Sequence, residues 1–131
     1  MLVSDLMSES VVTLAPDETL AQAADTLGSL GVSGAPVCDA DARVVGVFSK
    51  SDLVGRLIEG KLDPLARVGD HMSKLTISLR PSDTVSAAIV LMADKMVHRV
   101  LVLDEANHCV GIVSPLDIIA AIRDGRLALK A

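Results

Sequence analysis

A serine followed three residues later by an aspartate occurs twice in this chain, each time after a glycine. The first set is Gly46, Ser49 and Asp52, and the second is Gly111, Ser114 and Asp117. A serine that starts a helix and an acid three residues on form a capping box, which needs no ligand. The same helix start offers unpaired N–H groups to a phosphate, and a carboxylate can accept ribose hydroxyls. Each set therefore predicts a helix cap, a nucleotide contact, or both.

The whole chain is a duplication. A shift of 65 residues, the distance from Ser49 to Ser114, aligns residues 3–123 without a gap. About fifteen positions are identical, and proline, glycine and aspartate stay in step. A match of this kind predicts two copies of one structural unit rather than two unrelated segments.

Each copy reads as β-α-β-β-α. A short turn near residues 3–7 precedes a strand at 11–14, and a helix opens at Pro16 and Asp17. The remaining strands are expected at 35–38, 44–48, 100–103 and 109–113, and the closing helices at 51–59 and 116–123. The apolar helix faces are Leu20, Ala23, Ala24, Leu27 and Leu30, and then Val85, Ala88, Ile89, Met92 and Met96.

These elements predict an α+β fold, an α/β-type sandwich with two repeats packed about a pseudo-twofold axis into one module. The expected boundaries are 1–59 for the first repeat, 60–67 for a linker, 68–124 for the second repeat and 125–131 for a tail. One repeat of this length buries little apolar surface alone, so a shared core is expected.

Composition narrows the function. The net charge is −5 and the chain has one Phe, no Tyr and no Trp. Broad nucleic-acid binding needs a basic face and is disfavoured, and a bound base would lie against aliphatic side chains. The N-terminus is acidic and no long apolar span exists, which predicts a cytoplasmic protein with no membrane contact. The 50% hydrophobic content favours burial against a second copy as a homodimer.

The repeats resemble a tandem pair of CBS domains (cystathionine-β-synthase-type domains, the Bateman module). Each begins with V-x-D-x-M and ends with G-h-x-S-x-x-D, and the likeness runs from Val3 to about Arg123. The chain thus resembles a stand-alone CBS pair. The family implies an adenosine-containing effector in clefts between repeats, such as AMP, ADP, ATP, S-adenosylmethionine or NAD.

The resemblance also assigns residues. Asp52 and Asp117 would accept ribose hydroxyls, with Ser49 and Ser114 near the phosphate. Thr13 and Ser78 would line the adenine end of each cleft. Main-chain groups around Ala35 and Val100 could read the base edge, with apolar contact from Pro36 and Leu101.

The cations differ between the repeats. His98 and Arg99 resemble the phosphate-facing segment of the gamma subunit of AMP-activated protein kinase, but Ser33 and Gly34 stand at the matched positions. The first repeat instead offers Lys50, where the second has Pro115. The two clefts are therefore expected to differ, with the one lined by His98 and Arg99 favoured for occupancy.

Structural alternatives stand beside these roles. His98 and Arg99 fit a solvated strand entry or a dimer salt bridge, and Lys50 fits a plain surface lysine. His71 and His108 are interpreted as surface residues, Cys38 and Cys109 as reduced core residues, and the methionines as core filler.

Two functions remain open. The first is a regulatory module that binds an adenosyl ligand and signals to an unidentified effector protein in trans. The second is a dimerisation or docking module without a ligand. Catalysis is disfavoured, because the sequence offers no nucleophile–base pair and no metal cluster.

Overall fold

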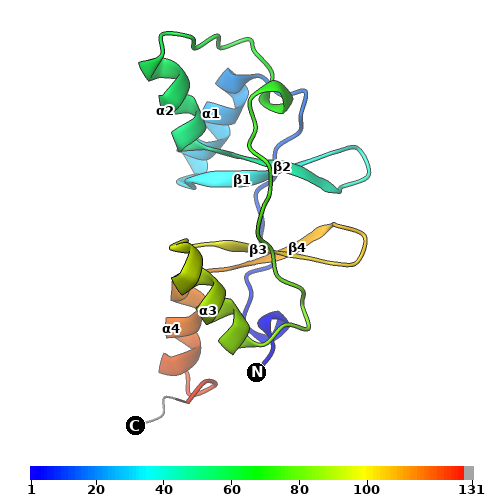
Figure 1. Cartoon of the computed structure of the whole chain (residues 1–131), viewed down its shortest axis with the longest axis vertical. Coiled ribbons are helices and arrows are strands. Elements are labelled where there is room, and N and C mark those ends of the chain that lie inside the picture. Colours follow the sequence, from blue (N-terminus) through cyan, green and yellow to red (C-terminus); the bar gives the residue numbers. More distant parts are fainter. Residues whose placement is uncertain (129–131) are drawn as a thin grey trace. The chain divides into compact units, whose positions relative to one another are not determined.

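A computed structural model describes residues 1–128. These residues form four helices and four strands. Figure 1 shows them in two similar groups. The first group is α1 (Leu20–Leu30), β1 (Gly34–Cys38), β2 (Val44–Ser49) and α2 (Lys50–Ile58). The second is α3 (Val85–Lys95), β3 (Val100–Leu103), β4 (Cys109–Val113) and α4 (Pro115–Arg123). Short 3₁₀ turns lie at Val3–Asp5 and Val68–Asp70. The predicted α+β class with a repeated unit is confirmed.

The chain divides into two compact units that do not coincide with the sequence repeats. Residues Val12–Thr76 form one, called the Asp52 unit, and Met1–Val11 joins the chain from Ile77 onward in the other, called the Asp117 unit. The opening segment of the first repeat is residues 1–11, and that of the second is residues 68–76. Each opening segment therefore folds with the hairpin of the other repeat. In each unit the two helices cover one face of the hairpin (Figure 1).

Each hairpin is extended by single pairs on both sides. In the Asp52 unit, β1 pairs antiparallel with β2, Leu14 bridges Val37 in parallel, and Ser73 bridges Val47. The Asp117 unit repeats this with β3 and β4, where Leu79 bridges Val102 and Ser8 bridges Ile112.

The predicted strand at 11–14 is wrong in extent, because only Leu14 pairs. Its N–H donates to Pro36 O at 2.9 Å and its carbonyl accepts from Cys38 N at 2.8 Å. The matched Leu79 also forms only a single bridge, with Val102, so the short pairing is common to both repeats.

The first long helix also starts later than predicted. Thr19 Oγ1 accepts the N–H of Gln22 at 3.1 Å, and Gln22 Oε1 accepts the N–H of Thr19 at 2.9 Å. This capping box fixes the start of α1 at Leu20, because it satisfies N–H groups that the first turn leaves unpaired. Pro16 and Asp17 lie in the preceding turn.

Each unit has its own aliphatic core. Leu20, Ala23 and Leu27 of α1 are buried in one, and Val85, Ala88 and Met92 of α3 are buried in the other. The rest of the predicted apolar faces lies exposed, namely Ala24, Leu30, Ile89 and Met96. Met96 is 87% exposed and follows the last turn of α3 in a left-handed conformation (φ 53°), so it is not core filler.

Gly46 and Gly111 are where these opening segments meet the hairpins most closely. A Cβ on Gly46 would lie 2.6 Å from Met72 Sδ and 2.9 Å from Ser73 O. A Cβ on Gly111 would lie 2.6 Å from Met7 Sδ and 3.1 Å from Ser8 O. The glycines therefore admit a neighbouring chain segment, one of the two uses expected of them.

We expect Gly46→Ala to lower the free energy of unfolding by about 1–3 kcal/mol, because a methyl group would overlap a side chain and a backbone oxygen. The matched control is Gly55→Ala within α2, where an added Cβ meets nothing within 4 Å. That variant should gain about 0.5–1 kcal/mol from helix propensity. Urea unfolding of both variants measures the difference, and equal stability of Gly46→Ala and wild type would contradict the close approach.

Candidate functional site

The Ser49 and Asp52 pair forms a capping box at the start of α2. Asp52 Oδ2 accepts the N–H of Ser49 at 2.8 Å and its hydroxyl at 3.1 Å, and Asp52 N donates to Ser49 Oγ at 3.4 Å. Contacts within the first turn thus help to hold both side chains at the helix end. The carboxylate is half-buried, so part of it remains accessible.

The Ser114 and Asp117 pair repeats this arrangement at the start of α4. Asp117 Oδ2 accepts the N–H of Ser114 at 2.8 Å and its hydroxyl at 3.1 Å. Pro115 occupies the first helical position, where a missing N–H costs nothing. Both predicted caps are therefore present.

Strand register places the second group of predicted residues beside these helix starts. Gly34 pairs directly with Ser49, and the N–H of Lys50 donates to Ser33 O at 2.9 Å. In the Asp117 unit, Val100 pairs with Val113, so Arg99 and Ser114 are the next residues along the two strands. Gly34 of β1 is thus paired with the N-cap of α2, and Arg99, the residue before β3, lies just beyond the pair of Val100 with Val113.

The cations at these positions are exposed. Lys50, His98 and Arg99 all have exposed side chains. Within residues 1–128 these side chains form no hydrogen bond or ion pair. Arg99 has Gly34 as its counterpart, and a Cβ on Gly34 would lie 3.3 Å from Ser49 Cβ. The first repeat thus packs its hairpin tightly where the second carries a cation.

The remaining predicted residues lie along the first strand of each hairpin. Thr13 precedes Leu14, which bonds to Pro36, and Ser78 precedes Leu79, which bonds to Leu101 O at 2.9 Å. Thr13 and Ser78 are exposed. The side chains of Ala35, Pro36 and Val100 are buried in the cores, so their main-chain atoms are the groups left for contact.

Sequence reasoning missed one neighbour of Asp52. The hydroxyl of Ser73 donates to Asp52 Oδ1 at 3.1 Å. Ser73 is held there by two backbone hydrogen bonds with Val47, of 2.8 and 2.9 Å. The repeated spacing of Ser8 and Ser73 before the two glycines was the only signal in the sequence.

The sequence predicts that His71 is a surface residue, but in the structure its side chain has a partner. It is half-buried, and its Nδ1 lies 2.5 Å from Nη2 of Arg56 on α2. Because a guanidinium only donates, Nδ1 must be the acceptor in this contact. The pair joins the opening segment of the second repeat to the closing helix of the first.

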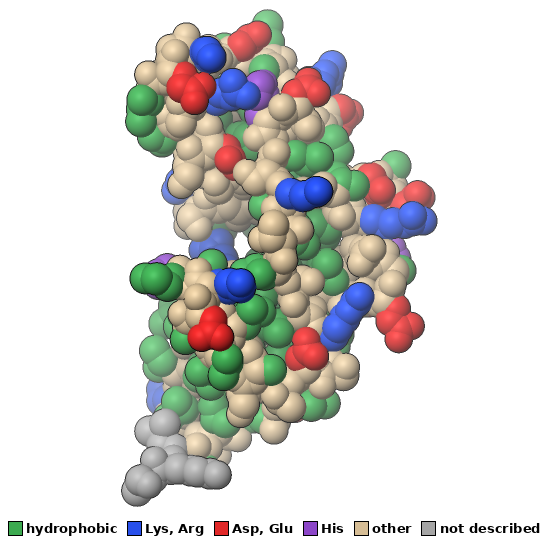
Figure 2. Space-filling view, in the orientation of Figure 1, with side chains coloured by type: hydrophobic (Ala, Val, Ile, Leu, Met, Phe, Trp, Pro, Cys, Tyr) green, Lys and Arg blue, Asp and Glu red, His purple; other side chains and the backbone are tan. Residues whose placement is uncertain are grey.

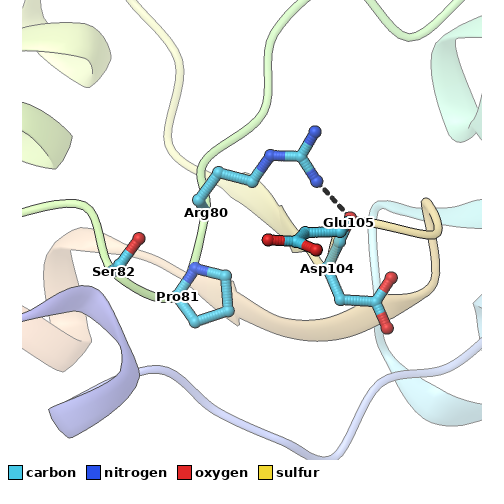
Figure 3. Close-up of a pocket in the computed structure, with 5 residues that line it drawn as sticks. All are labelled: Arg80, Pro81, Ser82, Asp104 and Glu105. Atoms are coloured by element: carbon cyan, nitrogen blue, oxygen red, sulfur yellow. Dashed lines mark hydrogen bonds between the residues drawn. The ribbon is translucent and has the colours of Figure 1, made fainter.

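A surface hollow of about 420 Å³ lies elsewhere in the Asp117 unit, lined by Arg80, Pro81, Ser82, Asp104 and Glu105 (Figure 3). Arg80 Nη1 donates to the carbonyl oxygens of Leu103, at 3.3 Å, and Asp104. The two carboxylates disfavour a phosphate in this hollow. None of the predicted site residues lines it.

The pKa values of two side chains near the hairpin turns, Cys38 and Asp104, are shifted from their ordinary values. The N–H of His108, with a smaller contribution from Ala106, lowers the pKa of Asp104. Burial, and then the charge of Asp39, raises the pKa of the Cys38 thiol. A raised pKa keeps Cys38 a thiol at neutral pH, which agrees with a reduced structural residue rather than a nucleophile.

Over residues 1–128, no helix has the length and apolarity needed to cross a bilayer. In the same range, no three His, Cys, Asp or Glu residues are grouped as metal ligands would be.

The chain is similar in sequence to a known enzyme over nearly its whole length. An inosine-5′-monophosphate dehydrogenase from Methanocaldococcus jannaschii is 29% identical over 97% of this chain, which spans 26% of that enzyme. The chain thus covers about a quarter of the length of this curated relative.

Two solved structures share the arrangement. The structure of CBSX2 in complex with AMP has a TM-score of 0.83 and 24% identity, covering 96% of this chain and 98% of that one. The CBS domain pair of protein MJ0100, in complex with 5′-methylthioadenosine and S-adenosylmethionine, has a TM-score of 0.79 and 22% identity, covering 95% and 98%. The sequence itself matches the CBS domain over residues 3–59 and again over 68–124. The chain therefore belongs to the CBS domain family and carries two copies of the domain.

Proposed function

We propose that this CBS pair is a regulatory module that binds an adenosine-containing ligand and signals to a separate effector protein. The observation that supports this proposal is the strand register: Val100 pairs with Val113, so Arg99 and Ser114 are the next residues beyond that pair. A ribose acceptor, a phosphate-type helix end and an exposed cation thereby meet in one unit.

In the Asp117 unit we assign the roles as follows. The Asp117 carboxylate accepts ribose hydroxyls, and the phosphate lies near Ser114 and the N–H groups that open α4. His98 and Arg99 supply positive charge, and Arg99 can donate two parallel hydrogen bonds to a phosphate. Their exposure and lack of a partner within residues 1–128 support this, because an ion pair would have occupied them.

In the Asp52 unit the roles are parallel but weaker. Asp52 accepts a ribose hydroxyl, Ser49 lies at the phosphate end, and Lys50 is the one nearby cation of this set. Gly34 replaces the arginine of the other unit. We therefore expect tighter phosphate binding at the site built from Asp117.

The adenine is expected along the first strand of each hairpin. Thr13 and Ser78 offer hydroxyls, while main-chain groups at Ala35 and Val100 offer hydrogen bonds to the base edge. Flanking contacts are aliphatic, because the single aromatic residue, Phe48, is buried. AMP, S-adenosylmethionine and 5′-methylthioadenosine occur in the similar structures, and we propose this ligand class here, with ADP, ATP and NAD to be tested beside it.

The alternative is a docking module without a ligand. Each Ser–Asp capping box closes on its own backbone, so neither carboxylate needs a ligand to be stable. This alternative predicts no rise in melting temperature with any adenosyl compound.

We also propose a homodimer, in the cytoplasm. Val54 on α2 and Ile119 on α4 occupy matched positions of the repeats and are 51% and 58% exposed. Leu57 and Ile58 extend the first face, and Leu116 extends the second. Figure 2 shows hydrophobic side chains exposed over α3 and α4. A surface that the duplication repeats suits a second copy of the same chain.

The ligand proposal is tested by calorimetry with AMP and with 5′-methylthioadenosine, which has no phosphate. We expect Asp117→Ala to weaken binding of both by about tenfold or more, because a charged hydrogen-bond acceptor is lost. Arg99→Ala should weaken AMP by about tenfold and change 5′-methylthioadenosine little.

Lys95→Ala is the matched control, since it removes an exposed cation from the end of α3 and should leave both affinities unchanged. The proposal fails if the wild type binds none of the adenosyl compounds, or if Lys95→Ala weakens AMP as much as Arg99→Ala does.

The homodimer is tested by light scattering over a wide range of concentration. We expect wild type to be dimeric and Ile119→Glu to shift it toward monomer, because a carboxylate would be buried in the apolar contact. Leu65→Glu is the control, as Leu65 is 76% exposed outside the helices. A monomeric wild type, or an equal effect of both variants, would contradict the helix-face dimer.

A further inference from the structure

The two aspartates proposed as ribose acceptors differ in the number of acceptor positions they have left. A carboxylate offers about four lone-pair positions, two on each oxygen. In both aspartates Oδ2 already accepts the N–H and the hydroxyl of the capping serine. What each can offer a ligand without breaking a bond therefore depends on Oδ1.

In the Asp52 unit, Oδ1 is partly occupied. Ser73 donates its hydroxyl to Asp52 Oδ1 at 3.1 Å. The donor is fixed by its backbone, because Ser73 exchanges two hydrogen bonds with Val47 beside Gly46. One acceptor position of the Asp52 carboxylate remains.

In the Asp117 unit the matched serine is Ser8, and its hydroxyl does not donate to Asp117. Ser8 exchanges the same pair of backbone hydrogen bonds with Ile112, at 2.8 and 2.9 Å. Across residues 1–128, however, no donor reaches Asp117 Oδ1. Both of its acceptor positions remain open.

We propose that Ser73 is a specificity-determining residue that competes with a ribose for the Asp52 carboxylate. The inference rests on the proposed function and deepens it. A cis-diol brings two hydroxyl donors, which Asp117 can accept together. Asp52 can accept one, unless Ser73 is displaced. The Asp52 site should then barely distinguish ribose from deoxyribose, while the Asp117 site should favour ribose.

The test is calorimetry with AMP and 2′-deoxy-AMP, with one site removed at a time. In an Asp117→Ala/Arg99→Ala background the Asp117 site is weakened by both changes, so the Asp52 site dominates the signal. We expect similar affinities for the two nucleotides there, within roughly twofold. Adding Ser73→Ala should tighten AMP by about threefold to tenfold and leave 2′-deoxy-AMP nearly unchanged.

The matched control is Ser8→Ala in an Asp52→Ala background. AMP should be preferred over 2′-deoxy-AMP at the Asp117 site, and the control should leave that preference unchanged. If Ser73→Ala leaves AMP affinity unaltered, or tightens both nucleotides equally, the competition is refuted while ligand binding at Asp117 stands. If wild type and every variant bind neither nucleotide, the proposed function fails and this inference with it.

A second measurement needs no ligand. In a double-mutant cycle on the melting temperature, Ser73→Ala and Asp52→Ala should be non-additive, because each removes the same hydrogen bond. Ser8→Ala and Asp117→Ala should be additive. Additive shifts in the first pair would overturn the contact on which the inference depends.

Discussion

The close backbone approach at Gly46 and Gly111 is the constraint on which the rest of this structure depends. At each glycine the opening segment of one repeat lies against the hairpin of the other, and a methyl group would overlap its methionine and its backbone. The opening segments of the two repeats are thereby exchanged, so each compact unit contains residues of both repeats. The exchange also brings Ser73 to the helix end that carries Asp52. Packing and the candidate site thus share one cause.

The second determinant is hairpin register. Gly34 pairs with Ser49, and Val100 pairs with Val113, so Arg99 and Ser114 are the next residues beyond the last pair of the second hairpin. At matched positions the first repeat has Gly34 and Lys50, and the second has Arg99 and Pro115. The cation therefore stands on a different segment in each repeat. Duplication supplied the same frame twice, and substitution within the frame made the two ends chemically different.

The spacing of apolar residues, together with the helix-capping and turn residues, predicted most of the fold. Four strands and both closing helices lie within about a residue of their expected positions, because short aliphatic runs and helix caps act locally. The failures have local causes as well. Thr19 caps α1 later than Pro16 suggests, and Leu14, like Leu79, forms a single bridge rather than a strand. Met96 fits the helical period but falls beyond the last turn, so it is exposed. The site was less predictable. The capping boxes could be read from spacing, but the contacts of Asp52 with Ser73 and of Arg56 with His71 join distant segments, and only the exchanged fold creates them.

We propose that Asp117, with the cations His98 and Arg99, holds an adenosine nucleotide. A crystal structure of the protein grown with AMP tests this binding most directly. We expect ribose hydroxyls within about 2.5–3.0 Å of Asp117 Oδ1, with the phosphate at the start of α4 near Arg99. AMP bound away from Asp117, or crystals without AMP at saturating concentration, would contradict it.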